Sequence, residues 1–175
     1  MNDTGGNGGA IAAAFGESVF DSFSVVENSL FHDNSTGSLN GTIWSSVTSE
    51  EPRLGLVNCT IANNTTGGVY WNADGWPTMV YNSILWNNGA YEVSPNCDDG
   101  AMVYYSDIMG GGGCDGFAGN INSNPNFDAP HFSLMAGSQC IDTASVASAP
   151  PTDITGAYRD PNPDMGAYEF FPEED

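Results

Sequence analysis

Short runs of alternating apolar and polar residues that end on asparagine recur along the chain. Three copies occupy Glu27–Asn34, Val57–Asn64 and Tyr81–Asn88, and a weaker copy occupies Tyr104–Gly111. Their aligned positions lie 30, 24 and 23 residues apart. These positions are Asn28, Asn58, Asn82 and Tyr105. A period of about 20–30 residues built from short strands and turns is typical of a solenoid.

A second repeat follows each asparagine turn and opens on glycine or asparagine. Its copies are Gly8–Ile11, Asn40–Ile43, Gly67–Tyr70 and Asn88–Tyr91. Each repeat thus contains a strand, a variable loop, a strand ending at asparagine and a short further strand, which is one coil of a parallel β-helix. Since parallel crossovers are almost always right-handed, we expect a right-handed all-β solenoid of about four coils plus a C-terminal capping region.

Stacked coils place equivalent residues about 4.8 Å apart, and alternation along a strand assigns them to a face. We expect one inward ladder of Ile11, Ile43, Tyr70 and Tyr91. A second inward ladder should contain Phe31, Ile61, Leu85 and Ile108. A small inward stack should contain Ser29, Cys59, Ser83 and Ser106, which makes Cys59 a core thiol.

The asparagines at the bends have a structural explanation. Asparagine tolerates the left-handed backbone conformation that a sharp bend requires, and stacked amides can bond along the axis. We therefore expect Asn28, Asn58 and Asn82 to form a column.

The outward positions of the glycine-opened strand offer a candidate ligand surface. Trp44, Trp71 and Glu92 each follow a residue of the first inward ladder, so they should point outward on adjacent coils. Two indoles beside a carboxylate would form a platform for sugar rings. In the alternative, the loop at 72–77 folds over both tryptophans and makes a satellite core.

Composition and charge exclude several partners. The 175 residues contain 22 acidic residues against two arginines and no lysine, which gives a net charge of −20. Nucleic acid and anionic membranes both need cationic contacts, so neither is expected as a partner. We also find no apolar run long enough to span a membrane.

The four cysteines permit three pairings. Cys97 and Cys114 fall in glycine-rich loops of the same coil, and we expect them to form a disulfide. The neighbouring acids Asp98, Asp99 and Asp115 are candidate oxygen ligands for Ca²⁺.

The chain divides into residues 1–117, which carry the coils, and residues 118–175, which carry a last partial coil, a cap and a tail. The cap should protect an open end of the solenoid, whose unpaired strands promote aggregation. Inside it we expect Arg159 to be clamped by the carboxylates of Asp164 and Glu169. At the other end the chain enters at Gly8–Ile11 without an amphipathic cap, so we expect a fragment with an open N-terminal face. Either upstream coils are missing there or another copy stacks on it.

Two features resemble a known family. The glycine-opened strands and asparagine rungs look like bacterial secreted proteins of the pectate-lyase-like fold. The segments at 122–145 and 152–170 resemble their choice-of-anchor C-terminal regions. The matching positions are Pro125, Phe132, Leu134, Gly137, Ser138, Ile141, Asp142, Asp153, Gly156, Arg159, Asp164, Gly166, Ala167, Tyr168 and Glu169. The resemblance implies an extracellular or cell-surface protein, although Met1–Ala10 lacks the features of a signal peptide.

Two function classes remain open. The first is a non-catalytic extracellular module that is structural, adhesive or filament-forming and binds polysaccharide. The second is part of a polysaccharide lyase or glycoside hydrolase. The outward positions show neither a lyase base nor the pair of facing carboxylates that a glycosidase needs, so we identify no catalytic residue and favour the first class.

Overall fold

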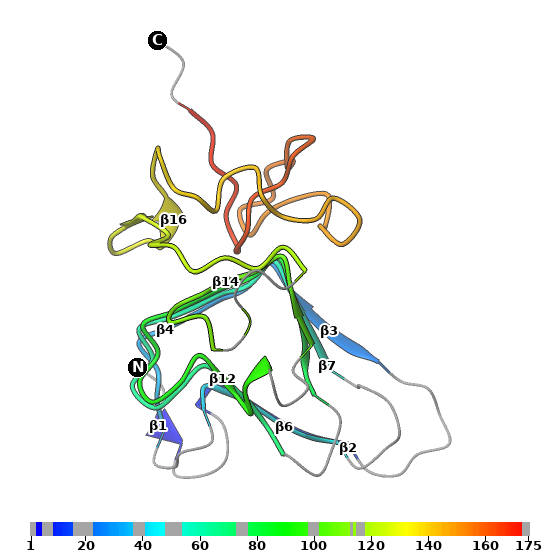
Figure 1. The fold of residues 1–175 in the computed structure, drawn as a ribbon, viewed down its shortest axis with the longest axis vertical. Coiled ribbons are helices and arrows are strands. Elements are labelled where there is room, and N and C mark those ends of the chain that lie inside the picture. Colours follow the sequence, from blue (N-terminus) through cyan, green and yellow to red (C-terminus); the bar gives the residue numbers. More distant parts are fainter. Residues whose placement is uncertain are drawn as a thin grey trace.

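The computed structural model describes residues 3–4, 9–15, 23–36, 41–47, 54–72, 77–97, 102–112, 114 and 118–172. Within these ranges the chain is all-β and contains no α-helix. Three parallel sheets of four strands face one another around a common interior (Figure 1). This stack of parallel strands in register is consistent with a β-helix.

The chain passes through the three sheets in turn, and we call one passage a rung. Rung 1 comprises β2 (Ile11–Phe15), β3 (Ser24–Glu27) and β4 (Leu30–His32). Rung 2 comprises β6 (Ile43–Val47), β7 (Leu54–Val57) and β8 (Thr60–Ala62). Rung 3 comprises β9 (Val69–Trp71), β10 (Met79–Tyr81) and β11 (Ile84–Trp86). Rung 4 comprises β12 (Val93–Ser94), β13 (Met102–Tyr104) and β14 (Asp107–Ile108).

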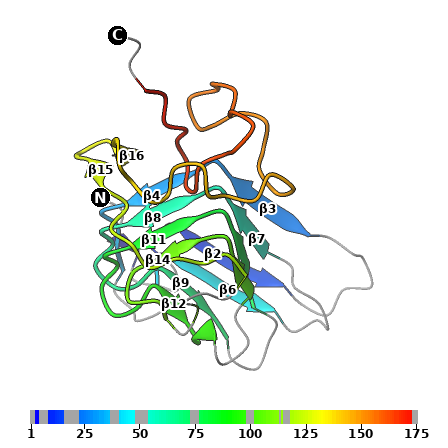
Figure 2. The same ribbon diagram turned by 45° about the horizontal axis from the view of Figure 1, so that its top comes forward.

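Each sheet collects one strand from every rung (Figure 2). The first sheet contains β2, β6, β9 and β12, the second β3, β7, β10 and β13, and the third β4, β8, β11 and β14. Two short pairs lie outside them. β1 (Asp3–Thr4) runs parallel to β5 (Ser35–Thr36), and β15 (Phe127–Asp128) runs antiparallel to β16 (Ser133–Leu134).

The asparagine column expected from the sequence lies between the second and third sheets. Asn28, Asn58 and Asn82 have φ of 47°, 48° and 52°, and Tyr105 continues them with 48°. The Asn82 side-chain amide donates to Asn58 Oδ1 at 3.1 Å. A single residue in the left-handed conformation therefore turns the chain at each rung.

The interior contains the second predicted ladder and the small stack. Phe31, Ile61, Leu85 and Ile108 pair from rung to rung in the third sheet. Cys59, Ser83 and Ser106 are fully buried. The backbone N–H of Cys59 donates to Ser83 Oγ at 3.1 Å, and that of Ser83 donates to Ser106 Oγ at 3.0 Å. Burial raises the pKa of the Cys59 thiol to about 12, in keeping with a core role.

The first inward ladder needs a correction. Ile11 pairs with Ile43 as expected, but the next members are Val69 and Val93 rather than Tyr70 and Tyr91. Val69 and Val93 are buried, whereas both tyrosines are partly exposed.

The C-terminal segment, residues 118–172, lies mainly against the outside of the third sheet (Figure 1, top). Only its beginning continues the stack, where Ile121 forms a parallel bridge with Asp107. The rest covers outward residues of the third sheet and forms a second apolar cluster. Its buried members are Ile84, Leu134, Cys140 and Met165. The capping region expected to protect an end therefore mostly protects a side.

The asparagine column anchors this segment. Asn28, Asn58 and Asn82 donate to the main-chain oxygens of Thr152, Asp164 and Ser145, respectively. Gly166 fits closely because its φ is 93° and a Cβ there would lie 2.8 Å from Ile84 Cδ1. Only glycine meets both conditions without strain.

Arg159 joins the segment to the bend of rung 1. Its guanidinium forms a buried ion pair with Glu169 at 2.8 Å and donates to Asn28 Oδ1 at 3.0 Å. Asp164 contributes only its main-chain oxygen, at 3.4 Å. The expected clamp of Arg159 by two carboxylates is therefore wrong, because only Glu169 contributes a carboxylate. The Asp164 carboxylate instead accepts hydrogen bonds from the backbone N–H groups of Asp142 and Phe170.

The asparagine column gives a first stability prediction. We expect Asn58→Gly to lower the free energy of unfolding by about 1–3 kcal/mol, because glycine keeps the left-handed bend but leaves buried partners unpaired. Asn63→Gly is the matched control, since Asn63 has φ of 56° but is exposed. Urea denaturation measures both variants, and equal effects would contradict a special role for the buried column.

Candidate functional site

The outer face of the first sheet gathers aromatic side chains. Trp44 on β6 pairs in register with Tyr70 on β9, and both side chains point away from the interior. The ring of Tyr91, from the turn before β12, lies 6.3 Å from that of Tyr70 at an angle of 48°. All three residues are partly exposed. We call Trp44, Tyr70 and Tyr91 the aromatic surface.

The side chain of Tyr91 packs closely against a glycine column. A Cβ at Gly67 would lie only 2.6 Å from two ring atoms of Tyr91, and a Cβ at Gly41 would lie 3.2 Å from its hydroxyl. Three adjacent ring atoms lie within 3.0 Å of that Gly67 position, so the ring packs closely against the backbone there. Tyr91 is partly exposed, so part of its side chain can contact a ligand. Burial, with a smaller effect from Tyr70, raises the pKa of Tyr91 to about 12, so its hydroxyl stays neutral.

Trp71 does not belong to this surface. Its side chain is only 2% exposed and packs in the interior cluster. The sequence alignment matched Tyr70 to Ile43, whereas the structure pairs Val69 with Ile43. A register difference of one residue exchanges the two faces of a strand, so Trp71 points inward and Tyr70 takes the outward position.

Glu92 also differs from expectation, because it terminates an internal asparagine ladder. The Asn34 amide donates to Asn64 Oδ1 at 3.0 Å, and the Asn64 amide donates to Asn88 Oδ1 at 2.7 Å. Asn88 in turn donates its backbone and side-chain N–H groups to the two carboxylate oxygens of Glu92. Glu92 is 8% exposed and therefore serves as a buried acceptor rather than an outward ligand group.

A small cleft of about 260 Å³ lies beside this carboxyl group. Tyr91, Glu92, Asn87 and Met109 contribute to its lining. Burial raises the pKa of Glu92 to about 7, although the donors from Asn88 favour its ionised form. Its raised pKa and its place at a cleft make Glu92 a candidate for a general acid. Both of its carboxylate oxygens, however, already accept hydrogen bonds from Asn88.

Asp107 is a second buried carboxyl group, on the outer side of the third sheet. It accepts a bond from the Cys140 thiol at 3.1 Å and one from the Ser123 N–H at 3.0 Å. Burial raises the pKa of Asp107 to about 6. Burial likewise raises the pKa of the Cys140 thiol above its ordinary value, so this thiol is an unreactive member of the second apolar cluster.

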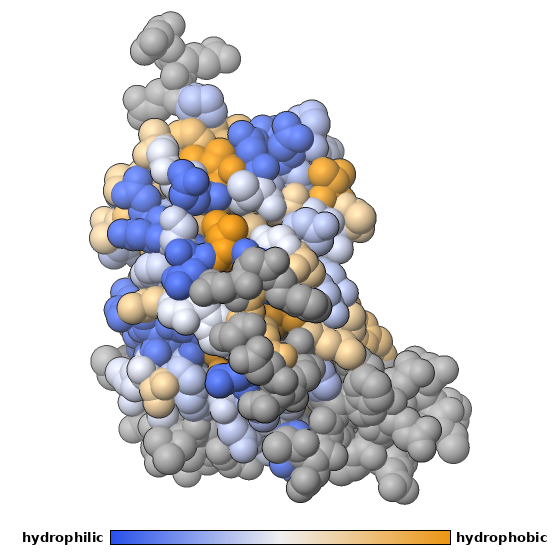
Figure 3. Space-filling view, viewed as in Figure 1, coloured by the Kyte–Doolittle hydropathy of each residue, from blue (hydrophilic) through white to orange (hydrophobic). Residues whose placement is uncertain are grey.

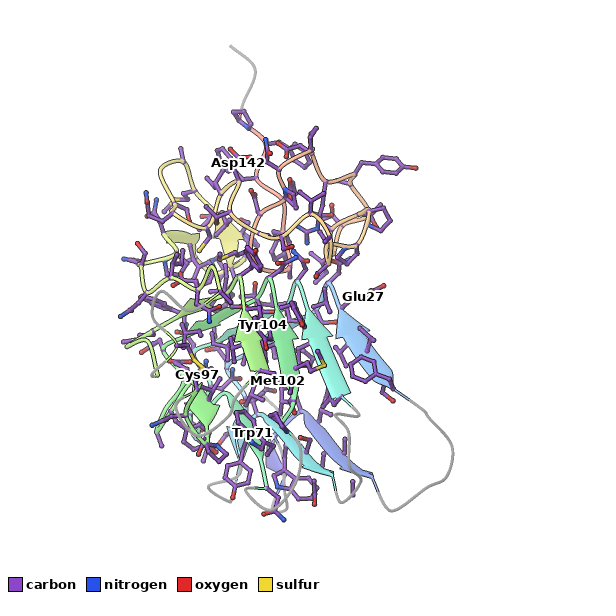
Figure 4. The ribbon with its side chains drawn as sticks, turned by 45° about the vertical axis from the view of Figure 1, so that its right-hand side comes forward. Glu27, Trp71, Cys97, Met102, Tyr104 and Asp142 are labelled. Carbon is purple, nitrogen blue, oxygen red and sulfur yellow. A yellow bond between two sulfur atoms is a disulfide. The ribbon has the colours of Figure 1, made fainter. Side chains whose placement is uncertain are left out.

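The outer face of the second sheet carries another set of apolar side chains (Figure 4). Tyr81 and Tyr104 stack with ring centres 4.9 Å apart and an angle of 20°. Val25 is 49% exposed, and Glu27 lies at the opposite edge of the sheet from Tyr104 (Figure 4). Sequence analysis missed this pair, although the identical tripeptides Met79–Tyr81 and Met102–Tyr104 could have indicated it.

The hydrophobic surface of the C-terminal segment is distributed in small separate patches among hydrophilic residues (Figure 3). One cleft of about 820 Å³ lies between β16 and residues 169–172. Leu134, Met135, Phe170 and Phe171 provide much of its apolar lining. It is far from the aromatic surface in sequence and shares none of its residues.

The predicted disulfide between Cys97 and Cys114 is confirmed, with Cα atoms 5.1 Å apart. The proposed calcium ligands Asp98, Asp99 and Asp115 lie outside the described residues. Among the described residues, no group of three or more His, Cys, Asp or Glu side chains is arranged to hold a metal ion. The described part of the chain also forms no helix of the length and apolarity that crossing a membrane requires.

No protein-family model, curated protein or solved structure matches the chain.

The buried carboxyl groups predict an unusual dependence of stability on pH. The pKa values of Glu92 and Asp164 rise to about 7 and that of Asp107 to about 6, above the ordinary values of 4.5 and 3.8. At pH values between the ordinary and the raised pKa of each group, the folded protein therefore binds more protons than the unfolded chain. We expect the free energy of unfolding to be highest near about pH 4–5 and to fall as the pH rises to about 8.

The variant Glu92→Gln tests this dependence. It removes one titrating group, so the fall in unfolding free energy between about pH 5 and about pH 8 should shrink by about 1–3 kcal/mol. The control Glu27→Gln removes the same charge from an exposed position and should leave the slope almost unchanged. Chemical denaturation across this pH range measures the slope, and an unaltered slope in Glu92→Gln would contradict the assignment.

Proposed function

We propose that this chain is a non-catalytic, extracellular or cell-surface module that binds polysaccharide through the aromatic surface. In this proposal the stacked sheets form a right-handed parallel β-helix of the pectate-lyase-like type, which acts as a rigid support. The observation that carries the proposal is the close packing of Tyr91 on Gly41 and Gly67 beside Tyr70 and Trp44, all three aromatic residues being partly exposed.

The chemistry of sugars fits this surface. A pyranose ring has an apolar C–H face that packs on an aromatic ring, while its hydroxyl groups remain hydrated at the edge. The aromatic side chains come from successive rungs, whose strands lie about 4.8 Å apart. The ring centres of Tyr70 and Tyr91 are 6.3 Å apart. A linear chain of sugars lying along the stack would contact several rings at once.

The disulfide supports the location. Disulfides persist in oxidising compartments and are rare in the cytosol of most organisms. Cys97 follows β12 within rung 4, and Cys114 follows β14 just beyond it. A secreted or surface protein is the setting in which such a bond is stable.

The alternative is that the chain is part of a polysaccharide lyase or glycoside hydrolase. Its specific support is Glu92, whose pKa of about 7 and position at a cleft are properties of many general acids. The donors from Asn88 occupy both carboxylate oxygens, however, so this carboxyl group already has a structural use. We therefore favour binding over catalysis.

Affinity electrophoresis in gels containing soluble polysaccharides tests the proposal. We expect at least one neutral polysaccharide to retard the native protein. Trp44→Ala and Tyr70→Ala should each bind at least about tenfold more weakly, because central aromatic residues contribute much of the free energy of binding. Tyr158→Ala is the matched control, because Tyr158 is 79% exposed on the C-terminal segment. Circular dichroism establishes that all variants fold.

Two results would contradict the proposal. One is unchanged retardation in both Trp44→Ala and Tyr70→Ala, or an equal loss in Tyr158→Ala. The other is release of reducing sugar or unsaturated product by the native protein that Glu92→Gln abolishes, which would favour the enzyme.

A further inference from the structure

The small cleft beside Glu92 adjoins the aromatic surface and shares Tyr91 with it. The turn between β11 and β12 forms one side of the cleft, where Ala90 is exposed and Tyr91 is partly exposed. Met109 and Gly110, which follow β14, form the other side. The volume of about 260 Å³ is below the range of about 300–1,000 Å³ that is typical of pockets for whole ligands. The cleft therefore has the size for one substituent of a larger molecule that is bound next to it.

The cleft offers both apolar and amide contacts. Met109 is 42% exposed, and its sulfur accepts the backbone N–H of Asn87 at 3.2 Å, which positions the thioether at the cleft. The Asn87 side chain donates one N–H to Asn63 Oδ1 at 2.8 Å. Among the described residues nothing donates to the side-chain oxygen of Asn87. Since Asn87 is exposed, this oxygen and the second N–H can pair with an amide group of a ligand.

The described residues of the cleft and of the aromatic surface include no cation. The chain has no lysine and two arginines. Arg159 is buried in its ion pair with Glu169 on the C-terminal segment, and Arg53 lies outside the described residues. The cleft is lined by Glu92, and the net charge of the chain is −20. A uronate or sulfate group would meet repulsion without an ion pair to offset it, so an acidic polysaccharide is disfavoured.

We propose that the cleft receives the acetamido group of an N-acetylated sugar whose ring contacts Tyr91, so that the ligand is an uncharged polysaccharide of N-acetylated amino sugars. This inference rests on the proposed binding of polysaccharide at the aromatic surface. An acetamido group is flat and uncharged, and it combines an apolar methyl group with one N–H donor and one carbonyl acceptor. The methyl group packs against Met109 and Tyr91, while the amide pairs with the side chain of Asn87.

The two related substituents, a hydroxyl and an amino group, fit the cleft less well. A hydroxyl group has no apolar part to cover Met109. An ammonium group would face Glu92, but both oxygens of that carboxyl group already accept hydrogen bonds from Asn88. The ammonium ion would lose part of its hydration beside acceptors that are already occupied, which is unfavourable. The acetylated sugar should therefore bind more tightly than either relative.

Three oligosaccharides with one β-1,4-linked backbone test this inference. They are the hexamers of N-acetylglucosamine, glucose and glucosamine, which differ only in the group at carbon 2. High salt screens the long-range attraction between the amino hexamer and an acidic protein. Under these conditions we expect isothermal titration calorimetry of the native protein to give a Kd at least about tenfold lower for the acetylated hexamer than for either of the others. Burial of a methyl group and one hydrogen bond account for a ratio of this order.

Two variants with matched controls locate the preference. Ala90→Phe fills the cleft, and Ala147→Phe adds the same ring at an exposed position of the C-terminal segment. Asn87→Gly keeps the left-handed bend, where φ is 57°, and removes the amide from the cleft. Asn63→Gly breaks the same hydrogen bond to Asn87 but removes no residue of the cleft. The ratio of the affinities for the acetylated and glucose hexamers should fall to about one in Ala90→Phe and about threefold in Asn87→Gly, and it should persist in both controls.

The outcomes separate this inference from the proposed function. Equal affinities for the three hexamers that Tyr70→Ala weakens would overturn the acetamido assignment and leave polysaccharide binding in place. A preference for the glucose or glucosamine hexamer would do the same, as would a preference that Ala90→Phe and Asn87→Gly both retain or that their controls lose equally. Failure of the acetylated hexamer to bind would also overturn the assignment, and the gel assay with other polysaccharides would then decide the proposed function alone. Circular dichroism establishes folding, and either variant is sufficient if the other does not fold.

Discussion

The left-handed asparagine bend is the constraint on which the rest of the structure depends. At Asn28, Asn58 and Asn82 one residue turns the chain from the second sheet to the third, with φ near 50°. This conformation is unfavourable for most side chains and tolerable for asparagine. The same amides then bond to the neighbouring rung or to the C-terminal segment. One residue type therefore fixes the bend, the stacking and the attachment of residues 118–172.

Polar ladders inside the stack make the register specific. Each buried side chain accepts the N–H of the previous rung, and an incomplete ladder would leave a buried donor unpaired at a cost of about 1–3 kcal/mol. The serine stack and the asparagine ladder each end on a residue type that does not occur earlier in that ladder. The serine stack ends on the side-chain oxygen of Asn120, and the asparagine ladder ends on Glu92. Burial of Glu92 at the end of this ladder raises its pKa, although the donors from Asn88 act in the opposite direction.

The sequence predicted the sheets well where side chains determine the backbone, and poorly where they do not. Asparagine tolerates the left-handed conformation of the bend, so aligning the asparagines gave the correct register of the third sheet. Glycine marks turns without fixing a register, and alignment on Gly67 displaced Trp71 to the wrong face. The position of the C-terminal segment depends on contacts between distant residues. Its local signals were the apolar Ile84 and Trp86 at outward positions of β11.

The three outer faces have become different in ways that bear on function. The third is covered by the chain itself, so its apolar residues serve stability. The second outer face presents the rings of Tyr81 and Tyr104, which stack on each other. On the first, Gly41 and Gly67 let the ring of Tyr91 pack closely against the backbone beside Tyr70. Aromatic content alone does not distinguish these faces. The close packing of Tyr91 does, and the absence of a Cβ at Gly67 makes that packing possible.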